Sequence, residues 1–171
     1  MDISGFVEIA APVRRVRNAI QKRENLVHFL TPGSILGERP DQGFDFIVQR
    51  NFGPVSIRLS GVLTVTPDPT RDGLFLIAKA GHILGGSVEL NLSMTFSGDA
   101  QTSKIVYAGT LEAGGLAGKV LGDSTSKVQS KMDQAFASFG LRMQRSQRAH
   151  ETHKAENWQA LPKGPLRPEG A

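Results

Sequence analysis

The sequence predicts an α+β fold, in which a curved antiparallel sheet of six to seven strands surrounds one long C-terminal helix. Two observations predict it. Apolar residues recur at every second position in several segments between residues 43 and 111, as in half-buried strands. From residue 116 to residue 142 the apolar spacing becomes helical, and at about 1.5 Å per residue such a helix could cross a whole sheet.

The N-terminal segment predicts one strand followed by two short helices. Apolar residues alternate over residues 3–9, which indicates a strand. Pro12 favours the first turn of a helix, because its φ is fixed and it lacks an N–H. A second short helix is expected over residues 25–30 and ends near Pro32.

The middle of the chain predicts the rest of the sheet. Gly53-Pro54 is a turn signal between two alternating segments, and glycine-rich or Asp-containing turns separate the others. The expected strands cover residues 44–52, 55–65, 74–80, 88–96 and 105–111.

The C-terminal region changes character after the predicted long helix. Beyond Arg145 the sequence becomes polar and then rich in proline and glycine, which is typical of a flexible segment. We therefore expect a ligand-binding domain over residues 1–145 and a flexible basic tail over residues 146–171.

Composition excludes several classes of protein. The 171 residues include no cysteine, so disulfides, thiolate nucleophiles and cysteine-based metal sites are excluded. No basic segment followed by an apolar run opens the chain, and no stretch of about 18 apolar residues occurs. These features predict a cytoplasmic protein, at most peripheral at the inner face of the cell membrane.

Two basic segments carry much of the net charge of +4. They are either solvated helix faces or a surface for an anionic partner, and the sequence leaves both interpretations open. No nucleic-acid motif accompanies them, so no nucleic-acid partner is expected. The segments are formed by Arg14, Arg15, Arg17, Lys22 and Arg23, and by Arg142, Arg145, Arg148, Lys154, Lys163 and Arg167.

The inward-facing positions predict a hydrophobic ligand cavity. A strongly bent sheet and a helix usually leave space between them, and apolar pockets with few polar groups are typical ligand sites. The alternative is a filled core, which the same pattern would produce. The predicted lining residues are Phe44, Phe46, Val48, Arg50, Ile57, Leu59, Leu76, Leu90, Leu92, Met94, Tyr107, Val128, Met132 and Phe136.

Two polar residues interrupt this apolar set. Arg50 is either a side chain that reaches water from the strand end, or a polar anchor for a carbonyl or carboxylate at the cavity mouth. Tyr107 is either a core ring whose hydroxyl bonds a neighbour, or a general acid.

No complete catalytic or metal-binding motif is present. The sequence contains no nucleophile elbow, no His-Glu-x-x-His and no Walker loop. The loop from Gly81 to Gly86 lacks the lysine that a phosphate cradle requires. His28, His82 and the pair His150 and His153 have no further ligand at metal-binding spacing. We therefore expect no metal and no enzymatic activity.

The chain resembles the CoxG family of carbon monoxide dehydrogenase accessory proteins, within the START-like (SRPBCC) superfamily of helix-grip proteins. The resemblance covers about residues 1–142 and depends on the order and spacing of short motifs. These are Met1-Asp2-Ile3-Ser4-Gly5, Ala11-Pro12 with Val16, Ala19 and Ile20, Leu30 with Pro32-Gly33, Gly53-Pro54-Val55-Ser56 with Gly61 and Val65, Gly114-Gly115-Leu116-Ala117 and Phe136.

The resemblance implies a non-enzymatic accessory protein of a molybdenum hydroxylase of the CO dehydrogenase type. Its ligand would be an isoprenoid quinone or a lipid, with no covalently bound cofactor. Members that anchor to membranes carry an apolar C-terminal helix, whereas this chain ends in Glu169-Gly170-Ala171, so we expect no insertion by its tail. The alternatives are a cyclase- or hydrolase-like enzyme using the same cavity, or a docking module with a filled core.

Overall fold

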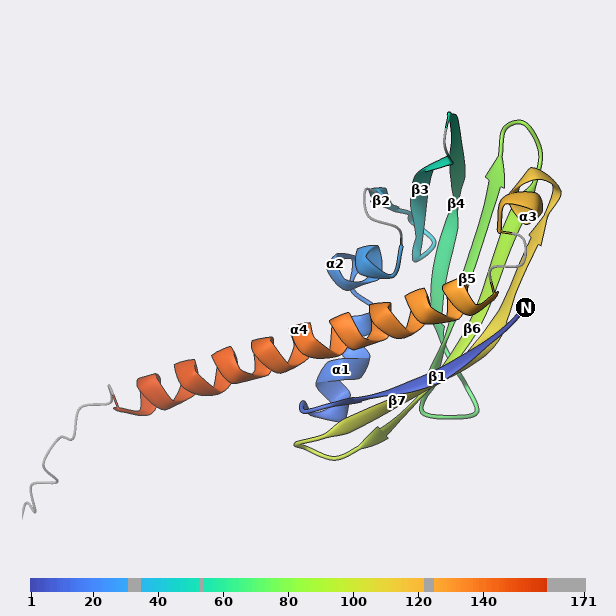
Figure 1. The fold of residues 1–171 in the computed structure, drawn as a ribbon. Helices are drawn as coiled ribbons and strands as arrows, with labels where there is room; N and C mark the ends of the chain where they lie inside the picture. Colours follow the sequence, from blue (N-terminus) through green and yellow to red (C-terminus); the bar gives the residue numbers. More distant parts are fainter. Residues whose placement is uncertain (31–34, 53, 122–124, 160–171) are drawn as a thin grey trace, which may run out of the picture.

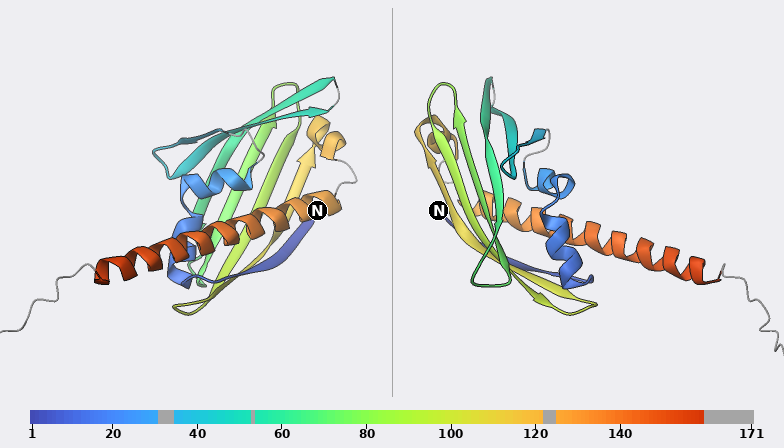
Figure 2. Two further views of the ribbon diagram at one scale, coloured as in Figure 1. Left: turned by 60° about the vertical axis from the view of Figure 1, so that its left-hand side comes forward. Right: turned by 180° about the vertical axis from the view of Figure 1, so that it is seen from behind.

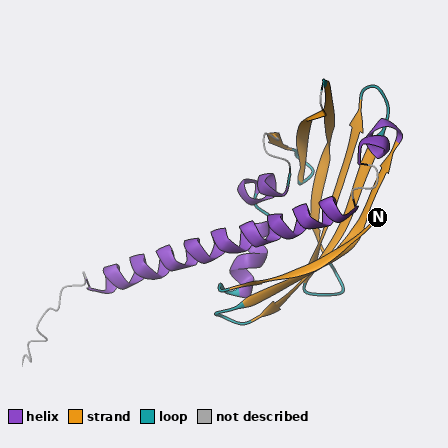
Figure 3. Cartoon of the chain, in the orientation of Figure 1, coloured by secondary structure: helices purple, strands orange, loops and turns teal. Residues whose placement is uncertain are grey.

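The computed structural model describes residues 1–30, 35–52, 54–121 and 125–159. It contains one seven-stranded antiparallel sheet and a set of helices on its concave face (Figures 1 and 3). The strands are β1 (Asp2–Ile9), β2 (Ile35–Glu38), β3 (Gly43–Phe52), β4 (Val55–Pro67), β5 (Gly73–His82), β6 (Ser87–Gly98) and β7 (Ser103–Gly114).

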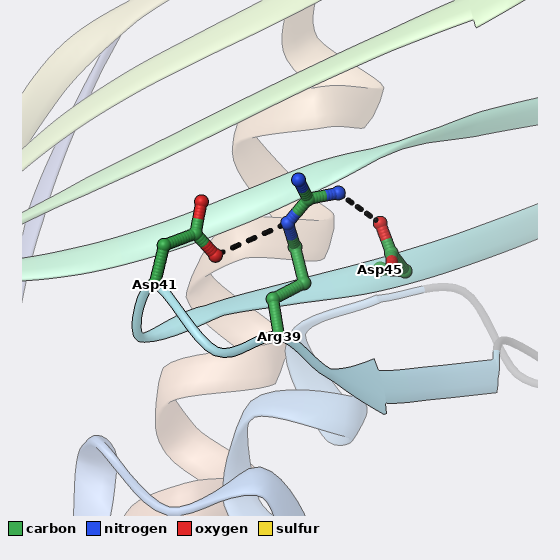
Figure 4. A network of polar contacts seen from close by, with 3 residues as sticks. All are labelled: Arg39, Asp41 and Asp45. Carbon is green, nitrogen blue, oxygen red and sulfur yellow. Dashed lines mark hydrogen bonds and ion pairs between the residues drawn. The ribbon is translucent and has the colours of Figure 1, made fainter.

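The strand order is β1-β7-β6-β5-β4-β3-β2, so the first strand pairs with the last. The predicted helix-grip architecture is confirmed. The short strand β2 was missed in the sequence, because it has four residues with a glycine inside. It pairs with β3, and Arg39 just after it contacts Asp41 at 3.2 Å and Asp45 at 2.9 Å (Figure 4). These ion pairs join the two ends of the β2–β3 turn.

Two glycines allow the central strands to bend sharply. A Cβ at Gly61 would collide with the backbone oxygen of Lys79, and a Cβ at Gly109 would collide with that of Asn91. Because glycine has no Cβ, neighbouring strands can approach closely on the concave side at these positions. The predicted turn residue Gly53 lies outside the described residues.

The helices lie on the concave side of the sheet. They are α1 (Val13–Ile20), α2 (Arg23–Leu26), the 3-10 turn η1 (Val27–Phe29), α3 (Gly115–Leu121) and α4 (Thr125–Gln159). Helix α4 crosses the concave face obliquely, beside α1 and α2 (Figure 2). Its far end extends beyond the sheet (Figure 1).

Helix α4 is longer than predicted. Its 35 residues end at Gln159, so residues 146–159, predicted as part of a flexible tail, are helical. The physical reason is the absence of proline and glycine between Arg142 and Gln159, together with several good helix formers. Gln147 also donates a hydrogen bond to Glu151 one turn later, at 2.8 Å. The Pro/Gly-rich segment 160–171 lies outside the described residues.

Candidate functional site

The inner face of the sheet changes from fully buried to half-buried along the same strands. On β6, Leu92, Met94 and Phe96 are buried, whereas Val88 and Leu90 are half-buried. The gradient is the same on β5 and β7, where burial is complete near the β6–β7 turn and partial near the β5–β6 turn. Buried there are Leu74, Leu76, Ala78, Ile105 and Tyr107, and half-buried are Ala80, His82 and Leu111.

Helix α4 shows the same gradient on the face that packs against the core. Phe136, Phe139 and Met143 are buried, whereas Val128 and Met132, nearer the N-terminus of the helix, are half-buried. Helix α1 contacts β6 and β7 and thereby adds to the cover of the closed part. In the left view of Figure 2, α1, α2 and α4 lie away from the β5–β6 turn, and the short helix α3 lies beside it, in contact with β6 and β7.

These positions define two regions of one concave surface. We call the half-buried apolar region the open end. It consists of Val48, Leu59, Ala80, Leu90, Leu111, Val128 and Met132. We call the fully buried region the closed end. It consists of Leu74, Leu92, Met94, Phe96, Ile105, Tyr107, Phe136 and Phe139.

The predicted lining residues divide between a packed core and this partly exposed surface. Buried are Phe46, Ile57, Leu76, Leu92, Met94, Tyr107 and Phe136. Half-buried are Phe44, Val48, Leu59, Leu90, Val128 and Met132. The side chain of Arg50 lies outside the described part of the structure. The first group is packed as the filled-core alternative describes, and the second group is partly exposed to solvent.

Tyr107 is a core ring whose hydroxyl is bonded. It is 1% exposed, stacks on Phe136 with ring centroids 4.1 Å apart, and donates a hydrogen bond to Asp133 on α4. Gln129 donates to the same carboxylate at 2.9 Å and to the backbone of Ser4 at 2.8 Å. A side chain at position 5 would collide with the Tyr107 hydroxyl, so Gly5 leaves the space for this contact.

The environment of Tyr107 makes its hydroxyl a weaker acid than an ordinary tyrosine. Burial raises the pKa of the phenol, and the Asp133 carboxylate that accepts its hydrogen bond raises this pKa further. A phenol whose proton is already held by a carboxylate is poorly placed to protonate a ligand.

His82 introduces a polar group at the rim of the open end. It lies directly opposite Leu59 in the β4–β5 register, so its ring belongs to the inner face. Its Nδ1 accepts a hydrogen bond from the backbone N–H of Leu84 at 3.1 Å. In the neutral ring this contact places the proton on Nε2, which can donate to a ligand.

The other histidines form no metal site in the described ranges. No group of three His, Asp or Glu side chains there is arranged to hold an ion. His28 is exposed. Its pKa is lowered mainly by partial desolvation and to a smaller extent by the charge of Arg142. His150 and His153 line a hollow of about 500 Å³ along the projecting end of α4, together with Lys154, Asn157 and Trp158.

A second pocket, of about 600 Å³, lies among α1, α2 and α4. Neither pocket contains a residue of the predicted cavity lining. None of the described helices, α4 included, combines the length and hydropathy needed to cross a lipid bilayer.

Sequence reasoning missed three contributors to the site. Leu111 and Ala80 continue the inward phase of their strands and could have been found from register alone. The third is Asp133, whose carboxylate accepts a hydrogen bond from the Tyr107 hydroxyl. Its position one turn after Gln129 gave no sign of a partner in β7, because that contact depends on how the helix crosses the sheet.

Comparison with known proteins finds similarity only among solved structures. No protein-family model matches the sequence, and a search of curated proteins found no match. A START superfamily protein from Mycobacterium smegmatis is 14% identical with a TM-score of 0.57, over 84% of this chain and 97% of that one.

Two other structures share the fold. The human StarD13 lipid transfer and protein localization domain is 16% identical with a TM-score of 0.51, over 78% of this chain and 74% of that one. The di-domain ARO/CYC StfQ from the steffimycin biosynthetic pathway is 12% identical with a TM-score of 0.54, over 85% of this chain and 46% of that one. The chain therefore has the helix-grip fold of START-like proteins.

Proposed function

We propose that this protein is a non-enzymatic carrier that binds an apolar ligand, a lipid or an isoprenoid quinone, at the open end of its concave face. The observation that carries the proposal is the burial gradient along β5, β6 and β7. Apolar side chains that a core would normally cover remain partly exposed there. A ligand that removes them from water gains roughly 25 cal/mol for each Å² of apolar surface buried.

One polar group at the rim would orient such a ligand. The Nε2 of His82 has no hydrogen-bond partner among the described residues and can donate to a ligand, since Nδ1 accepts from the Leu84 N–H. A quinone carbonyl or a lipid ester is an acceptor of the required kind. Apolar walls with one or two polar groups are the usual composition of a small-molecule site.

The state of Tyr107 favours binding over catalysis. Its hydroxyl proton is directed at Asp133, and its pKa is raised. Among the START-like structures, the StarD13 domain is described as a lipid transfer domain, which supports a lipid-sized ligand, and StfQ as an ARO/CYC protein. An enzymatic use of the same surface is therefore the rival hypothesis, and it requires a proton donor other than Tyr107.

The partner follows from the sequence resemblance to the CoxG family. We propose that the protein serves a molybdenum hydroxylase of the CO dehydrogenase type, either by carrying a quinone between the enzyme and a membrane or by recruiting the enzyme there. Such a role needs a ligand that can enter and leave, which a partly exposed apolar surface allows more readily than a closed cavity.

The first test is extraction of the freshly purified full chain with organic solvent and mass spectrometry against a mock purification. It is followed by uptake of added ubiquinone, measured by centrifugal separation of bound from free quinone. A stoichiometric lipid or quinone, or saturable uptake, supports the proposal. An empty extract together with no uptake overturns it.

The location is tested with Met132→Trp, which adds bulk at the open end from α4. We expect uptake to fall severalfold while the fold is retained, because Met132 is only half-buried. The matched control is Leu141→Trp on the same helix, where the side chain is 55% exposed and away from the core. Equal uptake by both variants would place the ligand elsewhere.

A further inference from the structure

The pocket among α1, α2 and α4 brings together the two basic segments of the sequence. Four cationic side chains line it, with Glu24 as its one carboxylate. The cations are Arg14, Arg15 and Lys22 from α1 and the turn after it, and Arg142 from α4. Segments more than a hundred residues apart thus place like charges around one hollow of about 600 Å³.

Arg142 is the member of this group whose charge is least satisfied. Its Nε and Nη2 are shielded from solvent and have no hydrogen-bond partner among the described residues. These two atoms share one edge of the planar guanidinium, the edge that engages an oxyanion through two parallel N–H···O bonds. Leaving buried N–H groups of a cation without an acceptor is costly, so this edge is suited to an acceptor that the described residues do not provide.

The positive charge around Arg142 is not neutralised by ion pairs in the described part of the chain. Within the described ranges no ion pair involves any of the four cations or Glu24. Arg15 donates to Gln147 at 2.6 Å and to the Ser146 hydroxyl at 2.8 Å, both uncharged, and so fixes α1 against α4. The lowered pKa of His28, to which the charge of Arg142 contributes, is consistent with an uncompensated cation nearby.

We propose that this pocket binds a phosphate group, with Arg142 as its bidentate ligand and Arg14 and Lys22 supplying further positive charge. A dianion suits several converging cations better than a single carboxylate does, and arginine matches phosphate geometry through its planar fork. The phosphate belongs either to a soluble molecule or to a lipid headgroup. The volume of about 600 Å³ is larger than phosphate needs and is typical of small-molecule sites.

The site is distinct from the proposed carrier surface. It lies among α1, α2 and α4, and none of its residues belongs to the open end. Each proposal can therefore fail without the other.

The test is isothermal titration calorimetry, in which the full chain is titrated with sodium phosphate at constant ionic strength. We expect saturable one-site binding, weakened about tenfold or more in Arg142→Gln. The matched control is Arg148→Gln, an exposed arginine of α4 outside the pocket, which should bind as the wild type does. Absence of saturable binding would overturn the proposal, because the pocket would then hold no phosphate. Equal loss of affinity in both variants would overturn it too, because phosphate would then be attracted to the basic surface in general.

A second variant protects the test against misfolding. Lys22→Gln changes an exposed side chain of the same pocket, and we expect severalfold weaker binding with unchanged unfolding. If Arg142→Gln does not fold and Lys22→Gln binds phosphate as the wild type does, the proposal is overturned.

Vesicles distinguish the two sources of phosphate. Phosphatidylcholine vesicles with and without phosphatidic acid are sedimented with the protein. The site is assigned to a lipid headgroup if three results agree. Sedimentation must require phosphatidic acid, it must fall in Arg142→Gln, and inorganic phosphate must reverse it. Saturable binding of inorganic phosphate without such sedimentation assigns it to a soluble phosphate compound.

Discussion

Two cross-strand pairs on the same two strands have opposite surroundings. Phe96 and Ile105 lie directly opposite each other on β6 and β7 and are 3% and 0% exposed. Leu90 and Leu111 form an equivalent pair on the same face and are half-buried. Both pairs consist of large apolar side chains on the same strands and the same face, so their different burial depends on what covers them.

This difference teaches that inward phase and burial are separate properties. The alternation of a strand determines which face a side chain occupies. Whether that face becomes core or a binding surface depends on where α1 and α4 cross it. At the closed end the apolar surface stabilises the fold, and at the open end it remains available to a ligand.

The largest expected effect is the loss of Phe136 at the closed end. Its ring is 1% exposed and stacks on Tyr107. It also packs edge to face against Phe29, with the ring centroids 4.9 Å apart. We expect Phe136→Ala to lower the free energy of unfolding by about 3–5 kcal/mol, because it leaves a cavity in packed surroundings. Urea denaturation followed by circular dichroism measures this loss.

The matched variant is Met132→Ala, one turn earlier on the same helix. Since Met132 is half-buried, we expect a loss of only about 1 kcal/mol, accompanied by weaker uptake of quinone. Equal losses of stability at the two positions would show that the open end is as tightly packed as the closed end.

The sequence was sufficient for most of the sheet and for the position of α1. Strands β3 to β7 alternate over ten or more residues each, which makes their faces readable. Strand β2 has only four residues, too few for a period to show. The end of α4 was misplaced, because the change to polar composition after Arg145 describes loss of packing rather than loss of helix.

The site could be predicted only in part for a related reason. Periodicity identified Leu90 and Leu92 as inward residues, but only Leu92 is covered. Coverage depends on the angle at which α4 crosses the sheet, and on the glycines that bend it. The same limit hid the contact between Tyr107 and Asp133, and the meeting of Arg14 with Arg142 in one pocket.

An intermediate effect is expected from Tyr107→Phe, which removes the hydrogen bond to Asp133. We expect a loss of about 1.5–3 kcal/mol near neutral pH, the usual contribution of a hydrogen bond to a charged group. The raised pKa also gives a pH dependence. Because the folded protein holds the phenolic proton more tightly than the unfolded chain, this contribution is complete below pH 10.0 and is lost as the pH rises above it.

The pH dependence is measured by urea denaturation between neutral pH and about pH 11, where the slope approaches 1.4 kcal/mol per pH unit. Wild type and Tyr107→Phe should therefore converge in stability at alkaline pH. Parallel pH profiles of the two proteins would show that another group causes the alkaline loss.

The smallest effect is expected where α1 is tied to the loop between β4 and β5. Arg17 and Asp72 form an ion pair at 2.7 Å, with side chains 36% and 56% exposed. An exposed pair of this kind contributes little, so Asp72→Asn should lower stability by less than about 1 kcal/mol. The difference should shrink further in about 1 M salt, where screening reaches contact distance. A change of quinone uptake in Asp72→Asn would contradict the separation of the two regions. It would mean that α1 couples the cover of the closed end to ligand access at the open end, so that the two regions move together.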